Sequence, residues 1–261
     1  MAKVVVYRES DGSIVNFEVH TGLKSALETA REYAANPAYP DKYVVFTDKQ
    51  TKLKTSQKDI EIVTESGIYM SCILRPSIFP SQASLLTSLS AAAMATALEE
   101  HTDKQVGIGW ISDIYCDGVK IGGVTVEGKL DNFTTYEYII VSFACALDED
   151  KFPPRLADMV KKVFESDNTS VNMIIARNIL HRFFKFYTNI KTPQKFMSTY
   201  TQKFALRGVK VKYRAGDKWK SHKVLGVDAK TGALIIDNGK DPEIYVTSPM
   251  LISTPKKIKI K

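Results

Sequence analysis

Short apolar runs between polar turns predict that the first half of the chain forms mostly β-strands. The runs 3–7 and 14–19 are separated by Ser-Asp-Gly-Ser, a turn cluster, and together they predict a hairpin. Apolar residues at helical spacing over 22–35 predict a helix that ends at Asn36 and Pro37. Further strands are expected at 43–47, 68–74, 106–110, 114–115, 119–126 and 138–145.

Two stretches between these strands have a different character. The polar stretch from Asp48 to Asp59 has almost no apolar content, and this predicts a loop. A helix is expected to start near Ser81, a residue type that suits the N-cap. Its wide apolar stripe consists of Leu85, Leu86, Leu89, Ala93, Met94 and Ala97.

From Pro154 onward the apolar spacing predicts helices, at about 154–165, 171–188 and 193–204. Beyond Gly208 the pattern changes to short strands at 209–213, 223–227, 233–236 and 244–246, with turns at 215–216, 231–232 and 238–239. Such spacing predicts a small β-barrel or sandwich. We therefore expect an α+β fold, a mixed sheet with helices packed on one side followed by a small all-β domain. The expected boundaries are 1–207, 208–254 and a basic tail at 255–261.

Composition places the chain among ordinary globular proteins. Of its 261 residues, 44% are hydrophobic and 25% are charged, which excludes disordered, collagenous and fibrous classes. No apolar run approaches the roughly 18 residues of a membrane span, and the N-terminus lacks the layout of a signal peptide. Three widely spaced cysteines, Cys72, Cys116 and Cys145, predict reduced, buried thiols in a cytoplasmic protein.

The net charge of +7 raises the question of a nucleic-acid partner. Four of the positive charges, Lys256, Lys257, Lys259 and Lys261, lie in the last six residues, where a solvated tail is the simpler interpretation. No DNA or membrane partner is therefore expected. Trp219 with Tyr213 could form an exposed aromatic patch, but the core of a small barrel is the favoured use.

The remaining sequence contains little competing chemistry. The four histidines, His20, His101, His181 and His222, are scattered without the spacing of metal ligands, so no protein-bound metal site is expected. No cysteine has a nearby histidine that would indicate a nucleophile. Gly122-Gly123 is too short for a phosphate loop, and the simpler interpretation is that it lets strands pack.

The most informative stretch is 109–123, Gly-Trp-Ile-Ser-Asp-Ile-Tyr-Cys-Asp-Gly-Val-Lys-Ile-Gly-Gly. Its Asp117-Gly118 turn predicts a hairpin that brings Asp113 and Lys120 close together on adjacent strands. A lysine and a carboxylate facing one pocket suit a nucleotide phosphate and its magnesium ion. A surface ion pair across the hairpin is the competing interpretation, because such pairs are common and weak.

This stretch resembles the signature of the biotin protein ligase family, Lys-Trp-Pro-Asn-Asp-hydrophobic-Tyr followed by a Gly-Lys-Lys-hydrophobic-Gly-Gly hairpin. The matching positions are Trp110, Asp113, Tyr115, Lys120 and Gly122. The resemblance extends from about residue 4 to residue 253, and its terminal part resembles the family's SH3-like domain. The resemblance does not include the family's winged-helix domain. It implies the class II synthetase-like fold of biotin and lipoate ligases.

By this resemblance, the chain would join biotin to AMP with ATP and Mg²⁺, then transfer biotin to a lysine of a biotin carboxyl carrier domain. Lys120 and Asp113 would be catalytic, with Mg²⁺ near Asp113, while Thr21, Gln50 and Trp110 would bind substrate. Pairing into a homodimer through a sheet edge is a further implication.

The ligand loop departs from the family pattern. The family has Gly-Arg-Gly-Arg-Arg-Gly after its glutamine, whereas this chain has Lys-Leu-Lys-Thr-Ser at 52–56. Lysine does not reproduce the planar fork of arginine, and the glycine conformations are lost. A ligase-like protein that binds a small molecule or a protein without catalysis is therefore a second hypothesis. A lipoate-type ligase ranks lower, because its Arg-Arg-X-X-Gly-Gly-Gly motif is missing.

Overall fold

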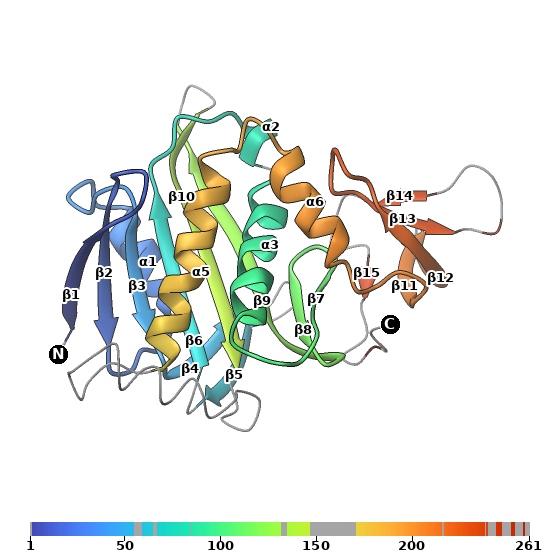
Figure 1. Ribbon diagram of the computed structural model, residues 1–261, viewed down its shortest axis with the longest axis horizontal. Coiled ribbons are helices and arrows are strands. Elements are labelled where there is room, and N and C mark those ends of the chain that lie inside the picture. Colours follow the sequence, from blue (N-terminus) through green and yellow to red (C-terminus); the bar gives the residue numbers. More distant parts are fainter. Residues whose placement is uncertain are drawn as a thin grey trace.

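The computed structural model describes residues 2–54, 59–64, 67–83, 85–131, 135–146, 171–215, 217–237, 239, 244–246, 252–253 and 258. A mixed β-sheet with helices forms the larger part of the molecule, and a small antiparallel sheet forms the C-terminal part (Figure 1). The predicted α+β fold, with a mixed sheet before a small all-β unit, is confirmed.

The large sheet has eight strands. In chain order they are β1 (Lys3–Arg8), β2 (Ile14–His20), β3 (Tyr43–Thr47), β6 (Gly67–Leu74), β7 (Val106–Gly109), β8 (Asp113–Cys116), β9 (Val119–Leu130) and β10 (Tyr136–Ala146). Their spatial order is β1-β2-β3-β6-β10-β9-β8-β7, with β2 and β3 parallel and the other neighbouring pairs antiparallel. The central strand β6 is buried along its whole length, as its largely apolar sequence predicts.

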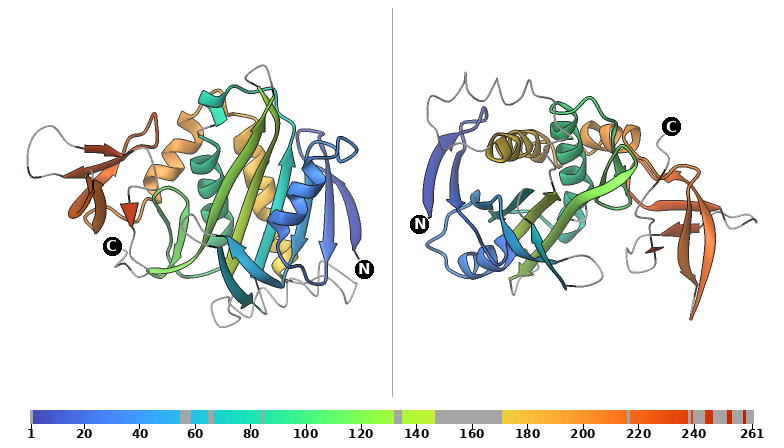
Figure 2. Two further views of the ribbon diagram at one scale, coloured as in Figure 1. Left: turned by 180° about the vertical axis from the view of Figure 1, so that it is seen from behind. Right: turned by 90° about the horizontal axis from the view of Figure 1, so that it is seen from below.

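Helices cover both faces of this sheet. On one face lies α1 (Ala26–Ala34), and on the other lie α3 (Leu86–Glu99) and α5 (Val171–Tyr187), as Figure 2 shows. Next to α3 packs α6 (Gln194–Gln202). The prediction that the helices pack on one side is therefore wrong for α1. We call the face that α1 covers the α1 face.

Two segments before residue 65 differ from the prediction. The first helix begins at Ala26 rather than near residue 22, because Ser25 is its N-cap and its Oγ accepts from Glu28 N at 3.3 Å. The predicted loop at 48–59 is wrong, since β4 (Gln50–Lys54) pairs with β5 (Asp59–Thr64). A hairpin is held by backbone hydrogen bonds, so it forms here without an apolar pattern in its first strand. Residues 55–58 lie outside the described residues.

Where one helix was expected to start near Ser81, the structure has two helices, α2 (Pro80–Ala83) and α3. Ser81 lies inside α2, so its prediction as an N-cap is wrong. The helices expected at 171–188 and 193–204 are confirmed by α5 and α6. The helix expected at 154–165 lies outside the described residues.

The C-terminal sheet contains five described strands, β11 (Lys210–Ala215), β12 (Lys218–Val227), β13 (Leu234–Asp237), β14 (Ile244–Val246) and β15 (Ile252–Ser253). The turn expected at 231–232 is present, with Gly232 at a φ of 72°. In the basic tail the structure describes Ile258, whose backbone N donates to Gly118 O at 2.8 Å, so the tail contacts the β8–β9 turn there. No described helix has both the length and the apolar character that crossing a membrane requires.

Candidate functional site

The centre of the candidate site is an ion pair between strands β8 and β9. Lys120 Nζ lies 2.7 Å from Asp113 Oδ1, which confirms the prediction that the two residues meet across the hairpin. The register pairs Asp113 with Gly123 and Tyr115 with Lys120, and it shifts between these pairs. Alternate residues of a strand share a face, so this bulge returns Lys120 to the face of Asp113.

The site lies on the α1 face, at one end of the sheet. The paired residues of one continuous row, running from β2 to β8, are His20, Thr47, Tyr69, Ala144, Gly123 and Asp113. Thr21 follows the first member of this row directly, and Gln50 lies three residues beyond Thr47. The register therefore brings the predicted substrate-binding residues Thr21 and Gln50 to the same end of the sheet as Asp113.

A buried pair of hydroxyls lies in the middle of this face. Ser71 of β6 and Ser142 of β10 are direct cross-strand partners, and their Oγ atoms are 2.7 Å apart. Their relative exposures are 1% and 9%, and apolar residues such as Val45, Ile73 and Ile140 form the core around them. Each hydroxyl can satisfy the other, so burial does not leave this pair of hydroxyls without a hydrogen bond.

Two glycines let the strands approach one another beneath the ion pair. A Cβ on Gly122 would lie 2.1 Å from Ala144 O, and a Cβ on Gly123 would lie 2.9 Å from Ser112 O. Any side chain would therefore force the backbones apart. The interpretation that these glycines let strands pack is confirmed.

Gly109 stands where the family signature has a lysine. A Cβ here would lie 2.6 Å from Cε2 of Tyr115, whose side chain is fully buried, and 3.0 Å from Cβ of Asp113. The Tyr115 ring thus occupies the space that a side chain at residue 109 would need. In this chain Lys120 supplies the cation next to Asp113.

Trp110 connects the two parts of the molecule. Its side chain is 3% exposed, and its Nε1 donates to Gly232 O in the C-terminal part at 2.8 Å. The next residue, Ile111, accepts a hydrogen bond from Tyr200 Oη of α6 at 2.9 Å. The segment before Asp113 is therefore held from both sides, and the polar atom of the Trp110 indole points to protein rather than to open space.

Gln50 lies at the start of α1. It is 6% exposed, and its Oε1 accepts from Ala26 N at 2.9 Å, so it satisfies one of the free N–H groups at the helix N-terminus. Backbone bonds from Leu23 N to Lys49 O and from Thr51 N to Leu23 O hold the two segments together. Thr21 is exposed nearby.

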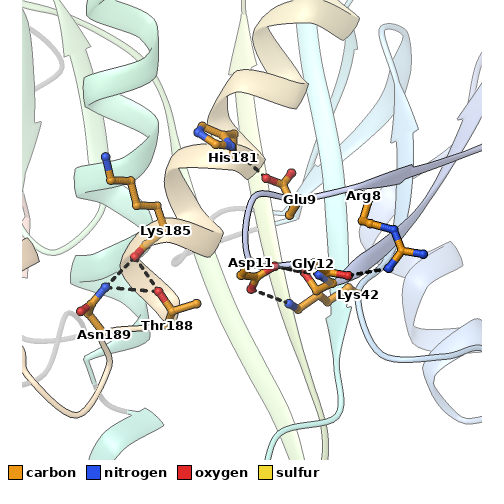
Figure 3. A network of polar contacts seen from close by, with 10 residues as sticks. Arg8, Glu9, Asp11, Gly12, Lys42, His181, Lys185, Thr188 and Asn189 are labelled. Carbon is orange, nitrogen blue, oxygen red and sulfur yellow. Dashed lines mark hydrogen bonds and ion pairs between the residues drawn. The ribbon is translucent and has the colours of Figure 1, made fainter.

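A separate pocket of about 410 Å³ opens between β1 and α5, on the other side of the sheet. Figure 3 shows the contacts beside it, where His181 Nδ1 lies 2.8 Å from Glu9 Oε2 and Lys42 Nζ lies 3.4 Å from Asp11 Oδ2. These contacts hold the β1–β2 turn against the rest of the sheet and α5. The pocket shares no lining residue with the candidate site.

Other reactive chemistry is limited in the described part of the chain. There, no group of three or more His, Cys, Asp or Glu side chains could hold a metal ion. The cysteines are free and buried, as predicted. Burial raises the pKa of the Cys72 thiol well above its usual value, which keeps it protonated.

Three residues shape this site without having been predicted to do so. Tyr200 and Gly232 hold the segment at 110–111, and Ser71 supplies a buried hydroxyl. Tyr200 resembles any apolar position of a helix, and Gly232 resembles any turn glycine. Ser71 could have been noticed, since it interrupts an apolar strand between Met70 and Cys72.

Fold and site together define a ligase-like protein, an α+β domain with an Asp–Lys hairpin followed by a small β-domain. Residues 23–144 match the model of the Biotin/lipoate A/B protein ligase family. A bifunctional ligase/repressor BirA of Bacillus subtilis (strain 168) is 29% identical over 234 residues, which cover 87% of this chain and 71% of the relative. Over this span the chain is similar to the biotin/lipoate protein ligase family.

Solved structures agree on the fold. A biotin protein ligase from Aquifex aeolicus in complex with biotin and ATP has a TM-score of 0.66 at 21% identity, with 91% of this chain and 97% of that chain covered. A biotin protein ligase-like protein of unknown function from Silicibacter sp. TM1040 has a TM-score of 0.60 at 13% identity, with 93% and 97% covered. At these identities the likeness shows the fold alone.

Proposed function

We propose that this chain is an ATP-dependent biotin–protein ligase, which adenylates biotin and transfers it to a lysine of a carrier domain. The observation that carries the proposal is the Asp113–Lys120 ion pair, 2.7 Å long, on the α1 face. The side chain of Lys120 is 38% exposed, so an incoming phosphate can reach its ammonium group. Similarity to the ligase family supports the reaction class.

In the first step, a carboxylate oxygen of biotin attacks the α-phosphorus of ATP, and the bond to pyrophosphate breaks. Negative charge builds on the α-phosphate oxygens, and Lys120 Nζ is placed to stabilise it. In the second step the amine of the carrier lysine attacks the acyl carbon, AMP leaves, and the amine loses a proton. Asp113 orients Lys120 in both steps and is placed to attract the incoming amine.

The two ends of the site suit an elongated ligand. Four strand spacings of about 4.8 Å separate Thr47 from Asp113 along the paired row, which is roughly 19 Å. A single small ligand would not span this distance, whereas biotin joined to AMP has two recognisable ends. We assign biotin to the end near Gln50 and Thr21, and the phosphate to the end near Lys120.

The residues fit a magnesium ion that arrives with ATP. Magnesium is commonly held by one or two carboxylates together with substrate phosphates, rather than by an all-protein cage. Asp113 offers one such carboxylate, and the lack of a larger acidic cluster in the described residues agrees with this arrangement. The ion would neutralise phosphate charge.

The proposed partner is a biotin carboxyl carrier domain, and the proposed location is the cytoplasm, which agrees with three buried free thiols. Many carrier domains are acidic, and the net charge of +7 would speed their encounter with the ligase.

The test is acyl-adenylate formation, followed by mass spectrometry after incubation with ATP, Mg²⁺ and either biotin or lipoate. Lys120→Ala is expected to lower the rate about 10²- to 10³-fold, the cost of removing one donor that stabilises transition-state charge. Lys129→Ala is the matched control, because Lys129 lies on the same strand and also forms a 2.7 Å ion pair, with Glu137. Equal rates for the two variants would contradict the role of Lys120.

A ligase-like protein that binds without catalysis is the second candidate. The Gln50 carbonyl already accepts from Ala26 N, and residues 52–56 lack the family's glycines and arginines, which favours weaker ligand capture. A thermal shift with biotin but no adenylate would support this candidate. Neither a shift nor an adenylate with biotin or lipoate would contradict both.

A further inference from the structure

The hairpin of β11 and β12 carries a positively charged face that the proposed ligase reaction does not use. The register pairs Lys210 with Lys223, Lys212 with Ser221 and Arg214 with Trp219. Because alternate residues of a strand share a face, these side chains lie together on one side of the hairpin. We call Lys210, Lys212, Arg214, Trp219 and Lys223 the basic face.

The basic face points to solvent. On the opposite face of the hairpin, Val211 is 1% exposed and Tyr213 packs against the main core. The members of the basic face are all exposed, and the hairpin projects from the rest of the molecule (Figure 2).

Trp219 is the most unusual member of this face. Its exposure is 50%, so the prediction that it lies in a barrel core is wrong. Large aromatic side chains gain stability from burial, and an indole left in water between cations gains little. An exposed tryptophan can instead offer a flat apolar surface to a ligand.

Two cations of this face lie directly opposite each other. Lys210 lies directly opposite Lys223, and like charges in such a pair destabilise a sheet. Among the described residues, Asp217 lies 4.0 Å from Arg214 at the hairpin tip. Asp237 faces Lys223 from β13, but its Oδ1 accepts from Gly239 N at 2.7 Å. A bound polyanion would relieve this repulsion.

We propose that the basic face binds a single-stranded nucleic acid. Alternate residues of β11 present cations about 6.8 Å apart in a line, which suits a phosphate backbone. Trp219 lies at one end of this line, where an unpaired base can stack on the indole. An acidic protein segment would contact the cations but has no base that could stack on the indole. In a duplex the bases are already stacked on each other and are not free to stack on Trp219.

The experiment measures fluorescence anisotropy of a labelled 12-nucleotide oligo-dT, with oligo-U, a 12-base-pair duplex and polyglutamate as the other probes. Wild-type protein is expected to bind the single strands with an affinity that falls steeply with salt. Trp219→Ala is expected to weaken binding about 5- to 150-fold, the range found for loss of one base–aromatic stack. Trp219→Phe should retain most of the affinity, since phenyl also stacks.

Charge removal is tested separately. The double variant Lys210→Gln/Lys212→Gln should reduce the slope of log affinity against log salt by about 1.4, or 0.7 for each phosphate contact on a single strand. The matched control is Lys24→Gln/Lys191→Gln, which removes two exposed lysines elsewhere and should leave the slope unchanged.

Intrinsic fluorescence gives a third readout. The chain has two tryptophans, and Trp110 is 3% exposed, so stacking should quench Trp219 and leave the Trp110 emission. Absence of single-strand binding at 50 mM salt overturns the proposal. Equal binding of polyglutamate or duplex, with no effect of Trp219→Ala, overturns it as well.

Discussion

The Trp110 side chain offers a direct test of how the two parts of the molecule are joined. Replacing Trp110 with Phe removes the Nε1–H group and leaves Gly232 O, at the other end of a buried 2.8 Å bond, without its donor. An unsatisfied buried carbonyl costs about 1–3 kcal/mol, and the smaller ring leaves a cavity, so we expect a total loss of roughly 2–4 kcal/mol. For a chain of this size, each kcal/mol lowers the Tm by about 2–4 °C.

Thermal unfolding of the ligand-free protein, followed by circular dichroism, measures this loss. Trp219→Phe is the control, because Trp219 is 50% exposed and its substitution should change stability by less than about 0.5 kcal/mol. An equal Tm for both variants would refute the reasoning. The resemblance to the ligase family instead implies that Trp110 contacts biotin, in which case Trp110→Phe would weaken biotin binding without lowering the Tm.

Three further substitutions test the packing and the charge state of the fold. Gly122→Ala places a Cβ 2.1 Å from Ala144 O, so it should cost more than about 3 kcal/mol in urea unfolding, and a neutral result would contradict the close approach of β9 and β10. Ser71→Ala leaves the buried Ser142 hydroxyl unpaired and should cost about 1–3 kcal/mol, whereas Ser71→Ala/Ser142→Ala should cost less than the sum of the single variants. Burial lowers the pKa of His101 from its usual 6.5, so His101 binds a proton in the unfolded chain at a higher pH than in the folded chain. The free energy of unfolding should therefore be constant above about pH 6.5 and fall as the pH drops toward the pKa of His101 in the folded chain. A His101→Gln variant should lose that part of the pH dependence, measured as Tm between pH 5 and 8, and an unchanged slope would show that another group is responsible.

Strands that cross the core could be predicted because their sequences are almost entirely apolar. The 67–74 strand is an example, since all eight of its residues are buried. The β4–β5 hairpin was missed because its first strand has little apolar content and its stability comes from backbone pairing. The alternation of Asp59 and Glu61 with Ile60 and Ile62 was the available signal for β5.

The Asp113–Lys120 pair could be predicted because both residues flank one Asp-Gly turn, and local chain geometry decides their distance. The hydrogen bond from Trp110 to Gly232 could not be predicted, because the two residues are 122 positions apart and Gly232 lies in the C-terminal part. Exposure of Trp219 also depends on which face of the β11–β12 hairpin packs inward. Apolar residues alternate along β11 and favour that choice, but β12 begins with four exposed residues, three of them lysine or tryptophan, that give no such pattern.

The arrangement along the sheet separates two requirements of the proposed reaction. Charge stabilisation depends on Lys120, which is held by Asp113 and by strands that the glycines bring close together. Closure over biotin depends on the segment after Gln50, which belongs to the separate two-stranded sheet of β4 and β5. Loss of the family's glycines and arginines from that segment would therefore weaken the retention of biotin without altering the geometry at Lys120. A ligand loop without the family's glycines and arginines is thus compatible with an intact phosphate site at Lys120. The substitutions at 52–56 are not in themselves an argument against adenylation.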